Sequence, residues 1–72
     1  MIEISIYTEF IKLDSFLKLA GIAGTGGHAK ILIQEGEVKV NGAVCTMRGK
    51  KLFRGDEISF EGETFKIILN DC

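Results

Sequence analysis

The 72-residue sequence contains no proline, no tryptophan and no low-complexity stretch, and it has only one histidine and two cysteines. The cysteines lie far apart, so with a single histidine they do not form the ligand pattern of a zinc site. We therefore expect no metal site and no cofactor. Both thiols are expected to be reduced and incidental to the structure.

Long hydrophobic runs are also missing. No apolar run approaches the roughly 20 residues that a helix needs to span a bilayer. Residues 1–10 carry two glutamates and no basic residue, which is unlike a signal peptide. We expect a cytoplasmic protein that has no membrane partner.

The composition that is present suits one small globular domain. Hydrophobic residues make up 46% of the chain, and charged residues are interspersed among them, which argues against disorder. No internal repeat or linker divides the sequence, so residues 1–72 are predicted to form a single domain. A chain of this size buries only about 60% of the surface of its unfolded state.

Positive charge gathers in one segment. Residues 38–55 hold five cations and no acid, whereas the segments on either side are both net negative; the five are Lys39, Arg48, Lys50, Lys51 and Arg54. A surface polarised in this way attracts phosphate backbones. The alternative interpretation is a charge-rich hairpin that is simply a solvated edge.

The first half of the chain predicts one strand and two helices. Isoleucines alternate with polar residues over residues 2–7, which is typical of a half-buried strand. From Leu13 the apolar spacing becomes helical, and Gly21 is a suitable stop. A second helix is predicted from about residue 26 to residue 35, with Thr25 as its N-cap and a glycine at its end.

The second half predicts strands. Residues 38–40 and 43–46 flank Asn41-Gly42, which favours a tight type I′ hairpin. After a polar and basic stretch, further strands begin near Ile58 and continue to Leu69 beyond a turn at Glu61-Gly62. The order β-α-α-β-β-β-β indicates an α+β fold, with two short helices packed on a small, mostly antiparallel sheet whose terminal strands can pair.

Two apparent catalytic or nucleotide motifs do not hold. Residues 24–29 (GTGGHA) fit the dinucleotide pattern G-x-G-x-x-G/A, but a helix precedes them and the required downstream acid is missing. His28 has no serine, cysteine or carboxylate arranged around it, so a surface position or an RNA contact is favoured over a catalytic base. No nucleophile–base pair can be assembled. We expect no enzyme and no small-molecule substrate.

Two other features have both a binding and a structural interpretation. The glycines before the second helix leave backbone N–H groups that are able to hold a phosphate oxygen, but the segment can equally be a plain connection between helices. Leu52-Phe53 can stack a base, although half-buried core packing is the favoured interpretation.

Three sequence segments resemble a known family. Residues 12–17 read KLDSFL, residues 29–42 read AKILIQEGEVKVNG and residues 55–58 read GDEI. They resemble the R-L-D-x-x-L, A-[RK]-x-L-I-x-x-G-x-V-x-V-N-G and G-D-x-[IV] motifs of the S4 RNA-binding domain, over about residues 12–60. FLKLA, TGGHAK and RGKKL further resemble the small stand-alone bacterial members of the YaaA and YbcJ type.

The resemblance implies an RNA-facing surface made by the two helices, the loop between them and the following hairpin. Its candidate RNA-binding residues are Lys12, Lys18, Thr25, Gly26, Gly27, His28, Lys30, Lys39, Arg48, Lys50 and Lys51. Thr25-Gly26 stands where many members carry Ser-Arg, so one usual cation is absent.

The function implied is non-catalytic binding of structured RNA, with ribosomal RNA as the expected partner and ribosome assembly as the expected role. Two alternatives remain. A ubiquitin-like sulfur carrier shares the Val-Asn-Gly and Gly-Asp segments but needs a C-terminal Gly-Gly, whereas this sequence ends Leu-Asn-Asp-Cys. A protein-interaction adaptor would use the basic hairpin against an acidic partner.

Overall fold

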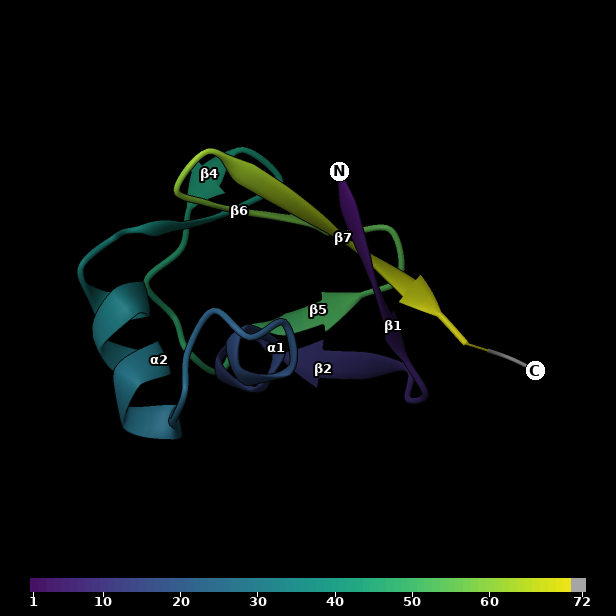
Figure 1. Ribbon diagram of the computed structural model, residues 1–72, viewed down its shortest axis with the longest axis horizontal. Helices are drawn as coiled ribbons and strands as arrows, with labels where there is room; N and C mark the ends of the chain where they lie inside the picture. Colours follow the sequence, from purple (N-terminus) through teal and green to yellow (C-terminus); the bar gives the residue numbers. More distant parts are fainter. Residues whose placement is uncertain (71–72) are drawn as a thin grey trace.

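The computed structural model describes residues 1–70 and contains two helices and seven strands (Figure 1). In chain order they are β1 (Ile2–Ile6), β2 (Phe10–Lys12), α1 (Leu13–Leu19), α2 (Gly26–Gln34), β3 (Val38–Val40), β4 (Ala43–Val44), β5 (Lys51–Phe53), β6 (Glu57–Phe60) and β7 (Glu63–Leu69). The predicted α+β class is confirmed.

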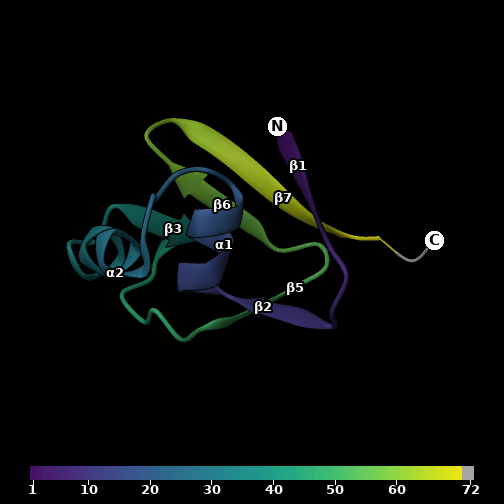
Figure 2. The same ribbon diagram turned by 60° about the horizontal axis from the view of Figure 1, so that its bottom comes forward.

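Five strands form the main sheet in the order β1-β7-β6-β3-β4. The two terminal strands pair in parallel, and all other neighbours are antiparallel. Both helices lie on one side of this sheet (Figures 1 and 2). Because side chains alternate along a strand, Val38 and Val40 point to the helices and are buried, whereas Lys39 lies exposed on the outer face.

A second sheet consists of β2 and β5 alone, and we refer to it as the ribbon. The predicted element order contains no strand for residues 10–12. Three residues are too few to display a strand period, and the pairing partner lies far along the chain. Figure 2 shows the ribbon next to α1, on the helix side of the main sheet.

The helices begin and end where the sequence predicts. In α2, Thr25 Oγ1 accepts a hydrogen bond of 3.1 Å from the backbone N–H of His28. Gly21 and Gly36 follow the two helices with φ values of +78° and +76°, a left-handed conformation that glycine adopts without a steric penalty. These local signals fix the lengths of both helices.

The core lies between the main sheet, the helices and the ribbon. Phe16 of α1 is fully buried and meets Phe65 of β7 edge to face, with ring centroids 6.3 Å apart. Leu52 of β5 is also fully buried, which confirms the core interpretation for that residue. Phe53 is 49% exposed, so core packing is wrong for the second half of that pair. Each fully buried side chain of this size contributes about 1.5–3 kcal/mol.

Candidate nucleic-acid interface

The start of α1 is bonded to the basic loop that precedes β5. The backbone N–H of Leu13 donates to the carbonyl of Lys50 at 2.9 Å, and that of Asp14 donates to the carbonyl of Arg48 at 3.1 Å. The first N–H groups of a helix have no partner within the helix, and Lys12 supplies no side-chain cap here. Loop carbonyls take that role, so the helix start fixes the position of the loop.

The ribbon brings two more cations to the same place. Lys12 and Lys51 are directly opposite one another in the β2–β5 register, and both are exposed. Together with the two loop residues they form a group that we call the basic junction: Lys12, Arg48, Lys50 and Lys51. Within residues 1–70 no carboxylate forms an ion pair with any of the four. The junction is therefore an uncompensated positive surface.

The loop before α2 is open to a ligand. Thr25, Gly27 and His28 are exposed, and a side-chain carbon added at Gly26 meets no atom within 4 Å. In the described part of the chain, the N–H groups of Gly26 and Gly27 make no hydrogen bond. Two backbone donors at a positive helix end thus face open space.

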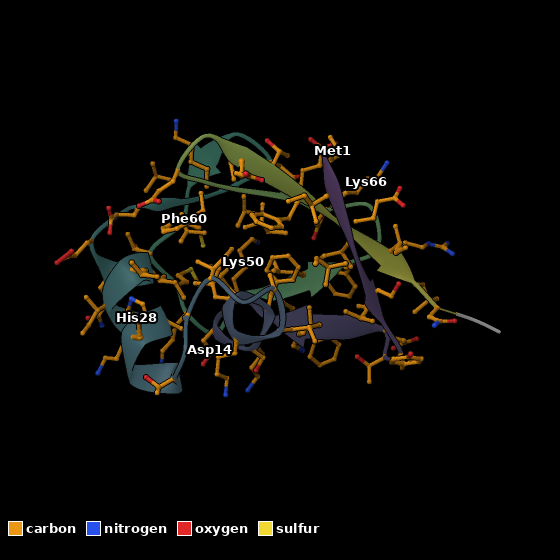
Figure 3. All side chains as sticks on the ribbon, viewed as in Figure 1. Met1, Asp14, His28, Lys50, Phe60 and Lys66 are labelled. Atoms are coloured by element: carbon orange, nitrogen blue, oxygen red, sulfur yellow. The ribbon has the colours of Figure 1, made fainter. Side chains whose placement is uncertain are left out.

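The remaining predicted cations divide between the two sides of the molecule. Lys18 on α1 and Lys30 on α2 are exposed on helices that pack against each other. Lys39 instead lies on the outer face of the main sheet, where it lines a hollow together with Glu37 and Glu61. The structure therefore separates Lys39 from the basic junction. Figure 3 shows the same division, with His28 on the helix side and Lys66 across the main sheet.

The most distinctive motif residues hold the fold together. Asn41 and Gly42 have φ values of +52° and +86°, as the predicted type I′ turn requires. Asn41 Nδ2 donates to Asp56 Oδ1 at 3.3 Å, and Asn41 Oδ1 accepts from the N–H of Glu57 at 3.0 Å. The Asn-Gly and Gly-Asp motifs are thus joined to each other and serve the scaffold.

Phe10 is a surface residue that the sequence-based interface omits. Its ring centroid is 6.0 Å from that of Phe53, and Lys51 Nζ lies 4.8 Å from it. The sequence did contain a signal. Phe10-Ile11-Lys12 and Lys51-Leu52-Phe53 both place an apolar residue between an aromatic and a cation, as expected of a strand with one buried face.

Other kinds of site find no support in residues 1–70. No group of three or more histidine, cysteine, aspartate or glutamate side chains is arranged to hold a metal ion there. Neither of the two helices has the length and apolar character that crossing a membrane requires.

A two-helix α+β domain with a basic helix side is the architecture that the sequence resemblance predicts. The sequence profile of the S4 domain matches residues 4–68. The chain therefore belongs to the S4 domain family.

The chain is similar to two stand-alone bacterial proteins. It is 49% identical over 66 residues to "Probable ribosome maturation protein RlbA" of Bacillus subtilis (strain 168), covering 90% of this chain and 93% of that one. It is 41% identical over 58 residues to "Putative RNA-binding protein YbcJ" of Escherichia coli (strain K12), covering 81% and 83%. The resemblance to the YbcJ type is confirmed.

Solved structures agree with this assignment. The solution structure of YbcJ from E. coli, described as revealing an ALFAL motif involved in RNA-binding, matches with a TM-score of 0.71 and 38% identity, over 94% of this chain and 87% of that one. Ribosomal protein S4e from Thermoplasma acidophilum matches with a TM-score of 0.67 over 89% of this chain and 34% of that one. At 22% identity, the second likeness concerns the fold alone.

Proposed function

We propose that this protein is a cytoplasmic, non-catalytic RNA-binding protein that recognises structured RNA. The observation that carries the proposal is the basic junction, in which backbone hydrogen bonds and strand pairing hold four cations together without compensating acids. The names of the B. subtilis and E. coli relatives support the same function.

The proposed interface extends from the basic junction over the helices. Its further residues are Lys18, Thr25, Gly26, Gly27, His28 and Lys30. Lysine and arginine side chains contact phosphates, while the open N–H groups before α2 accept one phosphate oxygen. Folded RNA presents its phosphates and shape more readily than its base edges, so such contacts suit a structured RNA.

The ligand that we propose is ribosomal RNA, with a role in ribosome maturation. Support comes from the name of the B. subtilis relative, with which this chain shares 49% identity across most of both chains. Crosslinking in cells followed by sequencing of the bound RNA tests this assignment. Enrichment of messenger or transfer RNA over ribosomal RNA would contradict it.

Binding itself is tested by titrating a fluorescently labelled, folded ribosomal RNA fragment at two ionic strengths. If four cations each neutralise one phosphate, raising the salt from about 50 to about 200 mM weakens binding on the order of 100-fold. An unchanged dissociation constant would contradict a phosphate-based interface. A protein adaptor is distinguished by a pull-down that persists after nuclease treatment.

A further inference from the structure

The outward face of the ribbon combines two aromatic rings with two cations. Phe10 is paired with Phe53 in the β2–β5 register, and Lys12 is paired with Lys51. The residues between them, Ile11 and Leu52, point the other way and pack in the core. All four outward side chains therefore share one surface, because alternate residues of a strand lie on the same face.

The two cations are held beside the rings. Lys51 Nζ lies 4.8 Å from the centroid of Phe10, within the range of a cation–π contact. Its cross-strand neighbour Lys12 has the same charge, and like charges directly opposite each other destabilise a strand pair. An anion placed between the two lysines would relieve that repulsion.

Phe53 is presented by a fixed backbone. Its N–H donates to Asp56 Oδ2 at 2.8 Å, and its carbonyl accepts from the Asp56 N–H at 3.0 Å. The side chain is nevertheless 49% exposed, and it lines a surface hollow together with Glu9, Arg54 and Leu69. A ring that is held in place and open to solvent loses little entropy when a flat group stacks on it.

Isolated exposed apolar side chains are ordinary on protein surfaces, and Tyr7 at 79% exposure is an example here. The ribbon differs because its two rings contact each other and adjoin two unpaired cations. Aromatic rings beside positive charge are the combination with which proteins bind single-stranded nucleic acid.

We propose that the outward face of the ribbon binds one unpaired nucleotide, whose base stacks on Phe53 while an adjoining phosphate lies between Lys12 and Lys51. The inference rests on the proposed RNA-binding function and adds the class of ligand at this site. The preferred RNA then contains a bulged or looped-out nucleotide next to a helix.

The test uses two RNA hairpins that differ only in one bulged nucleotide, which is a fluorescent adenine analogue. The full-length protein is expected to quench the analogue and to bind the bulged hairpin more tightly than the fully paired one. Phe53→Ala is expected to abolish the quenching and to weaken binding of the bulged hairpin at least about fivefold, the lower end of the cost of losing one base–aromatic stack. Binding of the paired hairpin is expected to change less than about twofold, because no base stacks there.

Two further variants make the result specific. Phe53→Leu keeps an apolar side chain against Phe10 but removes the ring, so it is expected to behave like Phe53→Ala. Tyr7→Ala removes a more exposed aromatic residue and is expected to bind as the parent does. Equal affinity of the parent for both hairpins, or unchanged quenching in both Phe53 variants, would overturn the inference while leaving the proposed function standing. Failure of the parent protein to bind either hairpin would instead contradict the proposed function.

Discussion

The basic junction and the outer face of the main sheet both carry lysines on paired strands, but their charges are arranged differently. On the outer face, Lys66 lies in register between Glu3 of β1 and Glu57 of β6. In the ribbon, Lys12 lies opposite Lys51. A lysine flanked by carboxylates contributes little net field, whereas facing lysines add their fields. The neighbours of a cation therefore decide whether it serves as a phosphate site.

The sharpest way to break this comparison is to remove the cations of one side. Changing Arg48, Lys50 and Lys51 together to glutamine is expected to weaken RNA binding roughly tenfold or more, at about 0.5 kcal/mol per exposed charge pair. The slope of affinity against salt is expected to fall by about three phosphate contacts. All three side chains are exposed, so the free energy of unfolding should change by no more than about 1 kcal/mol.

The matched control removes cations from the outer face. Lys39→Gln together with Lys66→Gln is expected to leave RNA affinity within about twofold, because both side chains lie across the main sheet from the junction and have acids near them. Fluorescence titration of both variants and thermal melts provide the readout. If Lys39→Gln alone abolished binding while the triple variant bound normally, the RNA would lie on the outer face.

A second test asks whether the RNA extends from the junction to α2. Gly27→Glu places a negative charge beside the open N–H groups, and the only atom that its Cβ meets within 4 Å is Thr25 Oγ1 at 3.9 Å. RNA binding is expected to weaken about fivefold. An acid in the first turn favours the helix, so the melting temperature is expected to stay level or to rise by a few degrees.

Gly27→Gln is the matched control for this position, since it adds nearly the same volume without charge. It is expected to bind RNA more tightly than Gly27→Glu does. Equal losses in both variants would assign the effect to bulk and remove the phosphate from this helix end.

The smallest expected effect concerns stability and sharpens the comparison from the opposite direction. Lys12→Glu replaces a like-charge pair by an opposite-charge pair and adds an acid at the start of α1. We expect it to raise the free energy of unfolding by about 0.5–1 kcal/mol while weakening RNA binding. Chemical denaturation measures the first effect, with Lys12→Gln as an uncharged reference that gains less. A destabilised Lys12→Glu variant would mean that the facing lysines cost the fold nothing.

The sequence predicted the long elements because each carries its own signal. The alternating isoleucines of β1, the stops at Gly21 and Gly36 and the turn at Asn41-Gly42 act locally, and all of them appear in the structure. The ribbon depends on pairing between distant three-residue segments, so no local pattern specifies it. Phe10 was missed as a surface residue for the same reason.

Charge clustering in the sequence also did not translate directly into one surface. Lys39 belongs to the same basic segment as Lys51, but the alternation of β3 sends its side chain to the outer face. Lys12, which is remote in sequence, joins the segment through the ribbon. Proximity along the chain therefore predicted the sign of the surface but only part of its membership.

The attachment of the basic loop to α1 separates what the loop is made of from where it lies. Only main-chain carbonyls of residues 48 and 50 accept the hydrogen bonds from the helix start, and every amino acid provides such a carbonyl. Both side chains are exposed, so substitutions there leave the attachment intact. Positions 48 and 50 are consequently suitable for randomised libraries, in which selection would retune the preferred RNA on an unchanged scaffold.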